Sequence, residues 1–125
     1  MNWSTDYVKE DGIVCAKTTG LITWNDNKKM SEEVLSLIRQ KGLHKVLIDH
    51  RDMIPNLSVL EIDSMPRMFK EIGVSQQDKV AVLYKTSSSR ESNFLFFQNV
   101  LRLESLQFKN FTDKAEALAW LKMED

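Results

Sequence analysis

Short apolar runs along the chain are separated by longer segments in which apolar residues recur at helical spacing. Loose alternation over residues 3–8 and a β-branched run over residues 13–19 flank Asp11-Gly12, a dipeptide that favours a hairpin turn. Gly20 is expected to interrupt the second run before a final apolar pair. The pattern therefore predicts two antiparallel strands at the start of the chain.

A first amphipathic helix is predicted to begin near Thr23 to Asn25, where a side chain can cap the exposed amide groups, and to end at Gly42. Acidic residues come early and basic residues late on its polar face, as the helix dipole favours. Its apolar stripe comprises Met30, Val34, Leu37 and Ile38.

Two runs of consecutive apolar residues, within 45–49 and 79–84, are typical of strands buried on both faces. Each is followed by polar residues and a helical pattern, which is typical of βαβ units. The second helix falls over 59–72, with Gly73 as its end. Because Pro66 lies inside this pattern, we expect a kink or a break into two shorter helices.

The chain closes with a third helix over roughly 90–103, a short strand over 107–111 and a last helix that Thr112-Asp113 caps. Trp120 is expected to anchor this last helix to the sheet. The predicted order is β-β-α-β-α-β-α-β-α. It defines an α/β fold whose mixed, mostly parallel sheet of about five strands is flanked by four main helices.

Composition narrows the class of protein. A chain of 125 residues suits one globular domain, 1–125, and is too short for two. Seventeen Lys and Arg against eighteen Asp and Glu leave a net charge of −1, without the basic field typical of nucleic-acid binding.

Cys15 is the single cysteine and is expected to be a buried structural thiol. With no secretory signal pattern and no run long enough to span a membrane, a cytoplasmic protein is expected.

Four stretches resemble the SpoIIAA-like family of small bacterial proteins. They are Thr18-Thr19-Gly20-Leu21-Ile22-Thr23, Leu47-Ile48-Asp49, Lys79-Val80-Ala81-Val82-Leu83, and Phe111-Thr112-Asp113 together with Glu116-Ala117-Leu118-Ala119-Trp120-Leu121. The resemblance implies a STAS-like fold, which the CRAL-TRIO lipid-binding domains broadly share. The anti-sigma-factor antagonists of this fold carry a phosphorylatable serine in an Asp-Ser-small-Gly context. Residues 50–58 lack that context, so the phosphosite is not transferred to Ser58.

Ligands of open α/β sheets bind beyond the carboxyl ends of parallel strands. Two loops are expected there, 49–52 and 85–90, and they share one crevice if their strands are neighbours. Serine hydroxyls with an arginine at a helix start can hold a carboxylate or phosphate, although a serine can equally serve only as a helix cap. The ligand-binding candidates are Asp49, His50, Arg51, Ser87, Ser88, Ser89 and Arg90.

A histidine between carboxylates can become a general base or a metal ligand. No nucleophile with its own orienting partner accompanies His50, however, and His44 lies at the opposite end of the strand. We therefore expect no catalytic residue, no metal site and no cofactor.

The third helix carries more apolar residues than one sheet-facing stripe requires. One row can pack on the sheet, while the other meets a neighbouring helix, a second subunit or an apolar ligand. Methionines of the second helix can line such a groove or simply fill the core. The interface or groove candidates are Phe94, Phe96, Phe97, Val100, Leu103, Met65 and Met68.

These features favour a non-enzymatic regulatory or protein-interaction module of STAS-like type, with a regulatory protein partner and with self-association through the third helix. The homodimer interpretation predicts that Phe96→Glu yields a folded monomer. The alternative is a carrier of a lipid or other small molecule, held between the second and third helices with its polar head near residues 87–90. An enzyme that uses His50 with Asp49 or Asp52 is a remote third reading.

Overall fold

The computed structural model describes residues 2–8, 11–55, 58–85 and 106–123. Within them the elements are β1 Trp3–Val8, β2 Ile13–Ile22, α1 Trp24–Lys41, β3 Lys45–Pro55, α2 Val59–Ile72, β4 Lys79–Leu83, β5 Gln107–Phe111 and α4 Lys114–Lys122. The helix expected over 90–103 lies outside the described residues.

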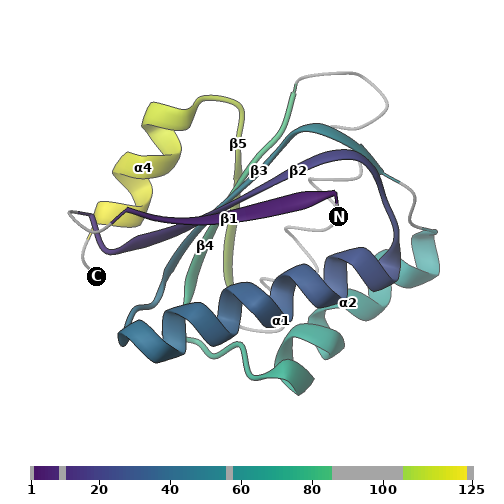
Figure 1. Cartoon of the computed structure of the whole chain (residues 1–125), viewed down its shortest axis with the longest axis horizontal. Coiled ribbons are helices and arrows are strands. Elements are labelled where there is room, and N and C mark those ends of the chain that lie inside the picture. Colours follow the sequence, from purple (N-terminus) through teal and green to yellow (C-terminus); the bar gives the residue numbers. More distant parts are fainter. Residues whose placement is uncertain (1, 9–10, 56–57, 86–105, 124–125) are drawn as a thin grey trace.

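The strands form one sheet in the order β1-β2-β3-β4-β5 (Figure 1). β1 pairs antiparallel with β2, and every other neighbouring pair is parallel. The predicted hairpin is confirmed, since Gly12 has a φ of 64° in the turn, a conformation that suits glycine. The predicted α/β class and the mixed, mostly parallel sheet are confirmed as well.

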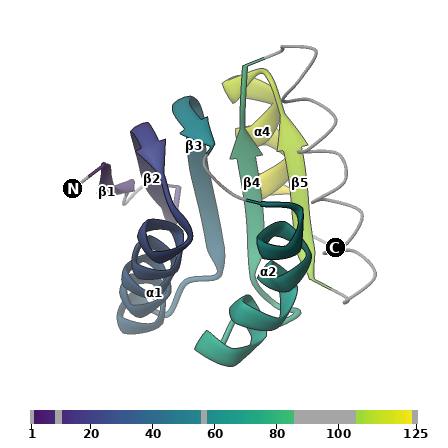
Figure 2. The same cartoon turned by 90° about the vertical axis from the view of Figure 1, so that its right-hand side faces the viewer.

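The described helices lie on both faces of the sheet. α1 and α2 lie on one face and α4 on the other (Figures 1 and 2). Alternate residues of β3 separate accordingly. Val46 and Ile48 pack in the core beneath α1 and α2, whereas Leu47 packs in the smaller core beneath α4. The consecutive apolar run therefore reflects burial on both faces, as predicted.

Local capping explains where the helices begin and end. The Thr23 side chain accepts a hydrogen bond from the Asp26 backbone, Asp26 reciprocates, and Gly42 closes α1 with a φ of 67°. These positions match the prediction, as does Gly73 at the end of α2. Of the kink or break expected at Pro66, the break is wrong, because α2 continues through the proline; the kink stays a prediction. Burial of the neighbouring Met65 and Phe69 side chains offsets the backbone hydrogen bond that proline cannot donate.

Two strand boundaries differ from the prediction. β2 runs without interruption through Gly20, whose φ of 70° is accommodated within the strand. β3 continues to Pro55, so the four residues of 49–52 belong to a strand and not to a loop. The reason is cross-strand pairing, since Asp52 to Pro55 bond beside Thr19 to Ile22 of β2.

Candidate functional site

An extra residue in β3 shapes the carboxyl end of the sheet. Lys17 pairs with Asp49 and Thr19 pairs with Asp52, so that Thr18 alone faces both His50 and Arg51. This two-against-one arrangement is a β-bulge, which re-aims the side chains near it.

His50 lies on the face of the sheet that α1 covers. Its Nδ1 is 2.7 Å from the hydroxyl of Thr18, which is fully buried. The same hydroxyl lies within hydrogen-bond distance of the Asp49 carbonyl oxygen, to which it donates at 3.3 Å. Burial lowers the pKa of His50 to about 4, against a weaker opposite effect of Asp49. The ring is therefore neutral at pH 7.

Asp49 points to the opposite face, because successive residues of a strand alternate. Its carboxylate accepts hydrogen bonds from Arg51 Nε at 2.9 Å, Arg51 Nη2 at 2.8 Å and the Arg51 backbone N–H at 3.0 Å. Burial alone raises the pKa of Asp49, but the bonds from Arg51 outweigh it and hold the pKa below its usual range. The expected grouping of acid, imidazole and base at one point is thus not formed.

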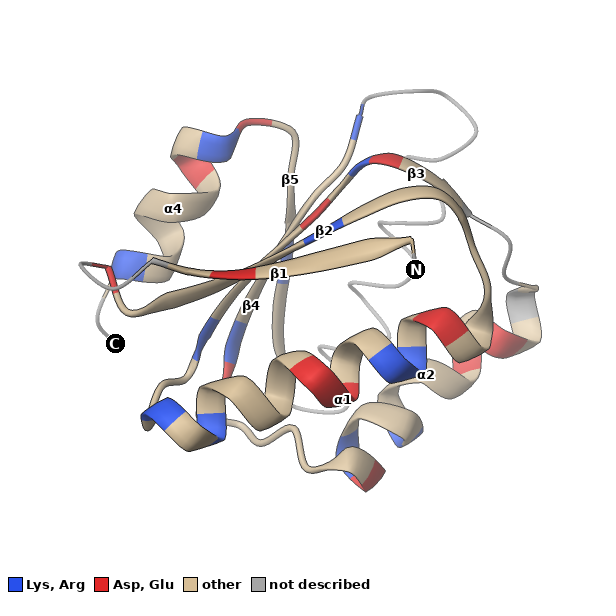
Figure 3. Cartoon of the chain, viewed as in Figure 1, with Lys and Arg blue, Asp and Glu red and all other residues tan. Residues whose placement is uncertain are grey.

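A second ion-pair group adjoins the first. Asp52 lies 3.3 Å from the Lys17 ammonium and 3.5 Å from that of Lys85, which follows β4. These interactions, that of Lys17 first, lower the pKa of Asp52. Figure 3 shows the charged residues on neighbouring β2 and β3 and beyond the end of β4.

Beside these charges lies an exposed apolar pair. Leu21 and Ile54 are cross-strand neighbours, and they are 48% and 51% exposed although the next positions, Ile22 and Met53, are buried. We call the combined surface the strand-end patch. It consists of Lys17, Leu21, Asp49, Arg51, Asp52, Ile54 and Lys85.

Sequence reasoning identified Asp49 and Arg51 as candidates but missed the apolar pair of the patch. Leu21 and Ile54 belong to ordinary apolar stretches, and their exposure depends on where α4 ends over the sheet. The missed signal was the length of β3. In a strand that continues past residue 52, successive side chains alternate between the two faces of the sheet, so Met53 and Ile54 lie on opposite faces.

Ser58 begins α2 directly after β3. Its hydroxyl accepts from the Glu61 backbone N–H at 3.1 Å, and the Glu61 carboxylate accepts from the Ser58 backbone N–H at 2.9 Å. The residue is exposed. Ser58 therefore occupies a helix start after this strand without the Asp-Ser-small-Gly context, and the Ser-x-x-Glu spacing is the signal that finds it.

Several predicted site residues lie outside the described residues. They are Ser87, Ser88, Ser89, Arg90, Phe94, Phe96, Phe97, Val100 and Leu103. β3 and β4 are neighbours, as the shared crevice requires. Met65 and Met68 are buried in the core beneath α1 and α2, and a role in lining a groove remains a prediction.

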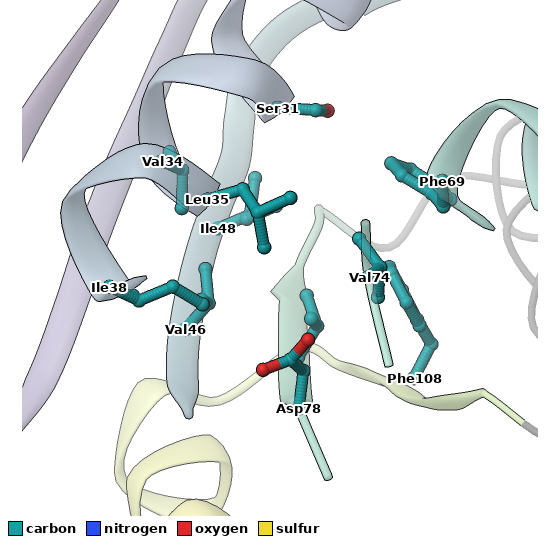
Figure 4. Close-up of a pocket in the computed structure, with 11 residues that line it drawn as sticks. Ser31, Val34, Leu35, Ile38, Val46, Ile48, Phe69, Val74, Asp78 and Phe108 are labelled. Carbon is teal, nitrogen blue, oxygen red and sulfur yellow. The ribbon is translucent and has the colours of Figure 1, made fainter. Parts of the chain in front are cut away.

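A small apolar cavity separates α1 from α2 above the sheet (Figure 4). It measures about 30 Å³ and is lined by Val34, Leu35, Phe69 and Phe108 among others. That space suits one water molecule, whereas ligand pockets usually enclose roughly 300–1,000 Å³. A wider groove of about 470 Å³ on the outer surface of the same helices is open, and polar and apolar side chains line it in similar measure, among them Lys28, Glu32 and Ile72.

The described part of the chain has no group of three or more His, Cys, Asp or Glu side chains suited to a metal ion. Among its helices, none is long and apolar enough to cross a membrane. Cys15 is only partly buried, and burial raises the pKa of its thiol.

The fold and the patch define a STAS-like α/β domain architecture with a charged, partly apolar strand-end surface. Residues 13–122 match the family model described as SpoIIAA-like, and the chain belongs to that family. An uncharacterized protein with a SpoIIAA-like fold from Shewanella loihica PV-4 is 21% identical, with a TM-score of 0.59 over 95% of this chain and 91% of that one. An anti-sigma factor antagonist from Mycobacterium paratuberculosis is 10% identical, with a TM-score of 0.64 over 97% and 95%. No curated protein matches the chain.

Proposed function

We propose that this protein is a non-enzymatic regulatory module that binds another protein through the strand-end patch. The observation that carries the proposal is the exposed Leu21–Ile54 pair beside the ion pairs of Asp52. A small apolar centre with charged groups at its rim is the usual composition of a protein–protein contact.

The state of the candidate catalytic groups supports the same choice over the enzyme reading. Arg51 occupies both carboxylate oxygens of Asp49, which is therefore a poor proton acceptor. His50 is partly buried on the other face of the sheet and is hydrogen-bonded to Thr18. A general base needs to reach the proton that it abstracts, and neither group is placed to do so.

One structural neighbour has a function of the proposed class. The Mycobacterium paratuberculosis protein is named an anti-sigma factor antagonist, so its role is exercised on another protein. At 10% identity the similarity carries the fold alone, and the proposal for this chain rests on its own surface.

The proposal is tested by capture and reconstitution. Tagged wild-type protein is cross-linked in extracts of its source organism, and the captured protein is then purified and titrated by calorimetry. We expect the double variant Leu21→Glu/Ile54→Glu to weaken binding by about 100-fold, because it places two charges in the apolar centre. Leu60→Glu, at a position that is 78% exposed on α2, is the matched control and retains binding.

Equal binding by the wild type and the double variant would place the partner elsewhere on the molecule and overturn the proposal. Thermal unfolding of all variants is the control for folding. A variant that unfolds at the same temperature as the wild type but binds more weakly has lost the contact surface and not the fold. Chemical turnover of a metabolite that survives the double variant would instead favour an enzyme.

A further inference from the structure

β1 is an edge strand of the described sheet. Its only partner among the described strands is β2. The Asn2 carbonyl accepts from the Thr19 backbone N–H at 2.8 Å, and in an antiparallel ladder the bonded residues alternate. The N–H and C=O groups of Trp3, Thr5 and Tyr7 therefore point away from β2. A bond from the Tyr7 N–H to the Asp6 carboxylate, at 2.8 Å, is an independent sign of this orientation.

α1 places opposite charges at the two ends of this edge. Glu33 accepts from Trp3 Nε1 at 2.8 Å and from the Thr5 hydroxyl at 3.3 Å. The Lys41 ammonium lies 4.3 Å from the centre of the Tyr7 ring. One end of the edge therefore carries Trp3 with an anion, and the other carries Tyr7 with a cation.

A two-fold axis at Thr5 makes this edge complementary to itself. In an antiparallel pair centred there, Trp3 of one copy lies opposite Tyr7 of the second copy, and the outward-pointing groups of Trp3 and Thr5 find partners. The Tyr7 carbonyl does so as well, while the Tyr7 N–H exchanges its bond to the Asp6 carboxylate for one to the second copy. The two strands would be about 4.8 Å apart, which brings Glu33 of one copy within reach of Lys41 of the other. Aromatic cross-strand pairs and opposite charges both stabilise such pairing.

Other registers lose this match. Moving the axis by one residue to Asp6 places two carboxylates opposite each other and no longer aligns Glu33 with Lys41. Moving it to Ser4 leaves Tyr7 without an aromatic neighbour. The charges, the aromatic rings and the orientation of the backbone thus select one register.

We propose that the occupant of the β1 edge is a second copy of this chain, paired antiparallel about Thr5 so that one sheet runs through both copies. The contact is distinct from the strand-end patch, so the two proposals stand or fall separately. It also differs from self-association through the third helix.

The first test is the mass of the purified protein by light scattering at high micromolar concentration. We expect twice the chain mass of 14.5 kDa for the wild type. Thr5→Pro removes an outward-pointing N–H, a change that an edge strand tolerates, and is expected to give a monomer. Thr5→Val keeps the N–H and the shape of the side chain, and is expected to remain a dimer.

Charge reversal tests the register independently of β1 folding. Glu33→Lys and Lys41→Glu each place like charges together, and each is expected to raise the dimer dissociation constant by about tenfold or more. The double variant loses the same contacts within the chain but restores opposite charges between copies. We therefore expect it to dimerise nearly as tightly as the wild type.

Disulfide trapping locates the axis directly. In a Cys15→Ser background, Thr5→Cys places two cysteines in a bonded pair with Cα atoms about 5.5 Å apart, and rapid oxidation to a covalent dimer is expected. Asp6→Cys is the control, because its Cα atoms would be more than about 7 Å apart. A monomeric wild type, a dimer that persists in Thr5→Pro, or a dimer abolished by Phe96→Glu but unaffected by charge reversal would each overturn the proposal.

Discussion

At the scale of single residues, the ionisation of His50 is coupled to folding. Burial lowers its pKa from 6.5 to about 4, so the unfolded chain binds a proton in this range and the folded chain does not. The contribution of neutral His50 to the free energy of unfolding is therefore fully present above pH 6.5 and declines as the pH falls from 6.5 towards 4. Because solvent still reaches part of the residue, the loss is at most about 3 kcal/mol.

The measurement is the free energy of unfolding by urea from pH 8 to pH 4, for the wild type and His50→Gln. We expect the variant to have the shallower dependence on pH between 6.5 and 4, since glutamine can bond to Thr18 without titrating. Parallel curves over that interval would contradict the assignment. A constant offset between the curves, present already at pH 8, would report only the change in packing.

At the scale of elements, the docking of α4 depends on a lysine from the sheet. Lys79 is 7% exposed, and its ammonium donates to the carbonyl oxygens of Trp120 at 2.7 Å and Met123 at 3.0 Å. It also lies 4.6 Å from the centre of the Trp120 ring. A cation at the carboxyl end of a helix satisfies carbonyl groups that the helix leaves unbonded. Trp120 is thus an anchor of the last helix, as the sequence predicted.

Lys79→Met is expected to lower the free energy of unfolding by about 1–3 kcal/mol, because it leaves the end of α4 without its donor. Hydrogen exchange of residues 114–122 should accelerate more than exchange in β2 and β3. The matched control is Lys114→Met, which removes a charge from the exposed start of α4 and should leave both quantities nearly unchanged. Uniform acceleration throughout the sheet would indicate a global effect.

The elements that sequence predicts well are those specified by local chemistry. Thr23 and Gly42 bound α1 by capping, and the apolar residues within 79–84 define a strand without reference to a neighbour. The predictions failed at Gly20, at Pro66 and at the end of β3. In each case, cross-strand bonding or burial against another element overrides the local signal, and neither is visible in a single segment.

At the scale of the whole molecule, one buried carboxylate joins three segments. Asp78, with a side chain 2% exposed, accepts two bonds from Arg39 of α1, at 2.8 and 2.7 Å. It also accepts from the Ser75 backbone N–H at 2.8 Å and lies 3.0 Å from His44, just before β3. Burial raises the pKa of Asp78, but these bonds, that of Arg39 first, outweigh it and lower the pKa.

Arg39→Ala is expected to cost about 2–4 kcal/mol at pH 7, less than for a fully buried pair because Arg39 is partly exposed. The lowered pKa of Asp78 means that its contribution is present above pH 3.8 and is lost as the pH falls below it. The deficit of the variant should therefore shrink in acid. Denaturant unfolding at pH 7 and at a pH below 3.8 measures this deficit, with Lys28→Ala on α1 as the control. A deficit that is unchanged in acid would contradict the ionic role of Asp78.

The candidate site could be predicted only in part. Sequence reasoning located Asp49 and Arg51 because charged residues follow an apolar run, and it left the pairing of Asp49 with a nearby base open. It could not separate His50 from them, because the separation depends on the two faces of a strand that was expected to have ended. Lys17 joins the patch from β2 and Lys85 from the segment after β4, through contacts that only the assembled sheet creates.

The bulge in β3 also bears on how such a site can arise in a lineage of proteins. Asp49 and Asp52 pair with Lys17 and Thr19 of β2, which have one residue between them, whereas Asp49 and Asp52 have two. β3 therefore contains one residue more than a regular pairing needs. A gene that lost the codon for that residue would still encode the same strand order, with every later side chain of β3 on its present face. Arg51, which holds the Asp49 carboxylate, lies in this bulge, so the arrangement that holds the carboxylate comes with a departure from a regular sheet.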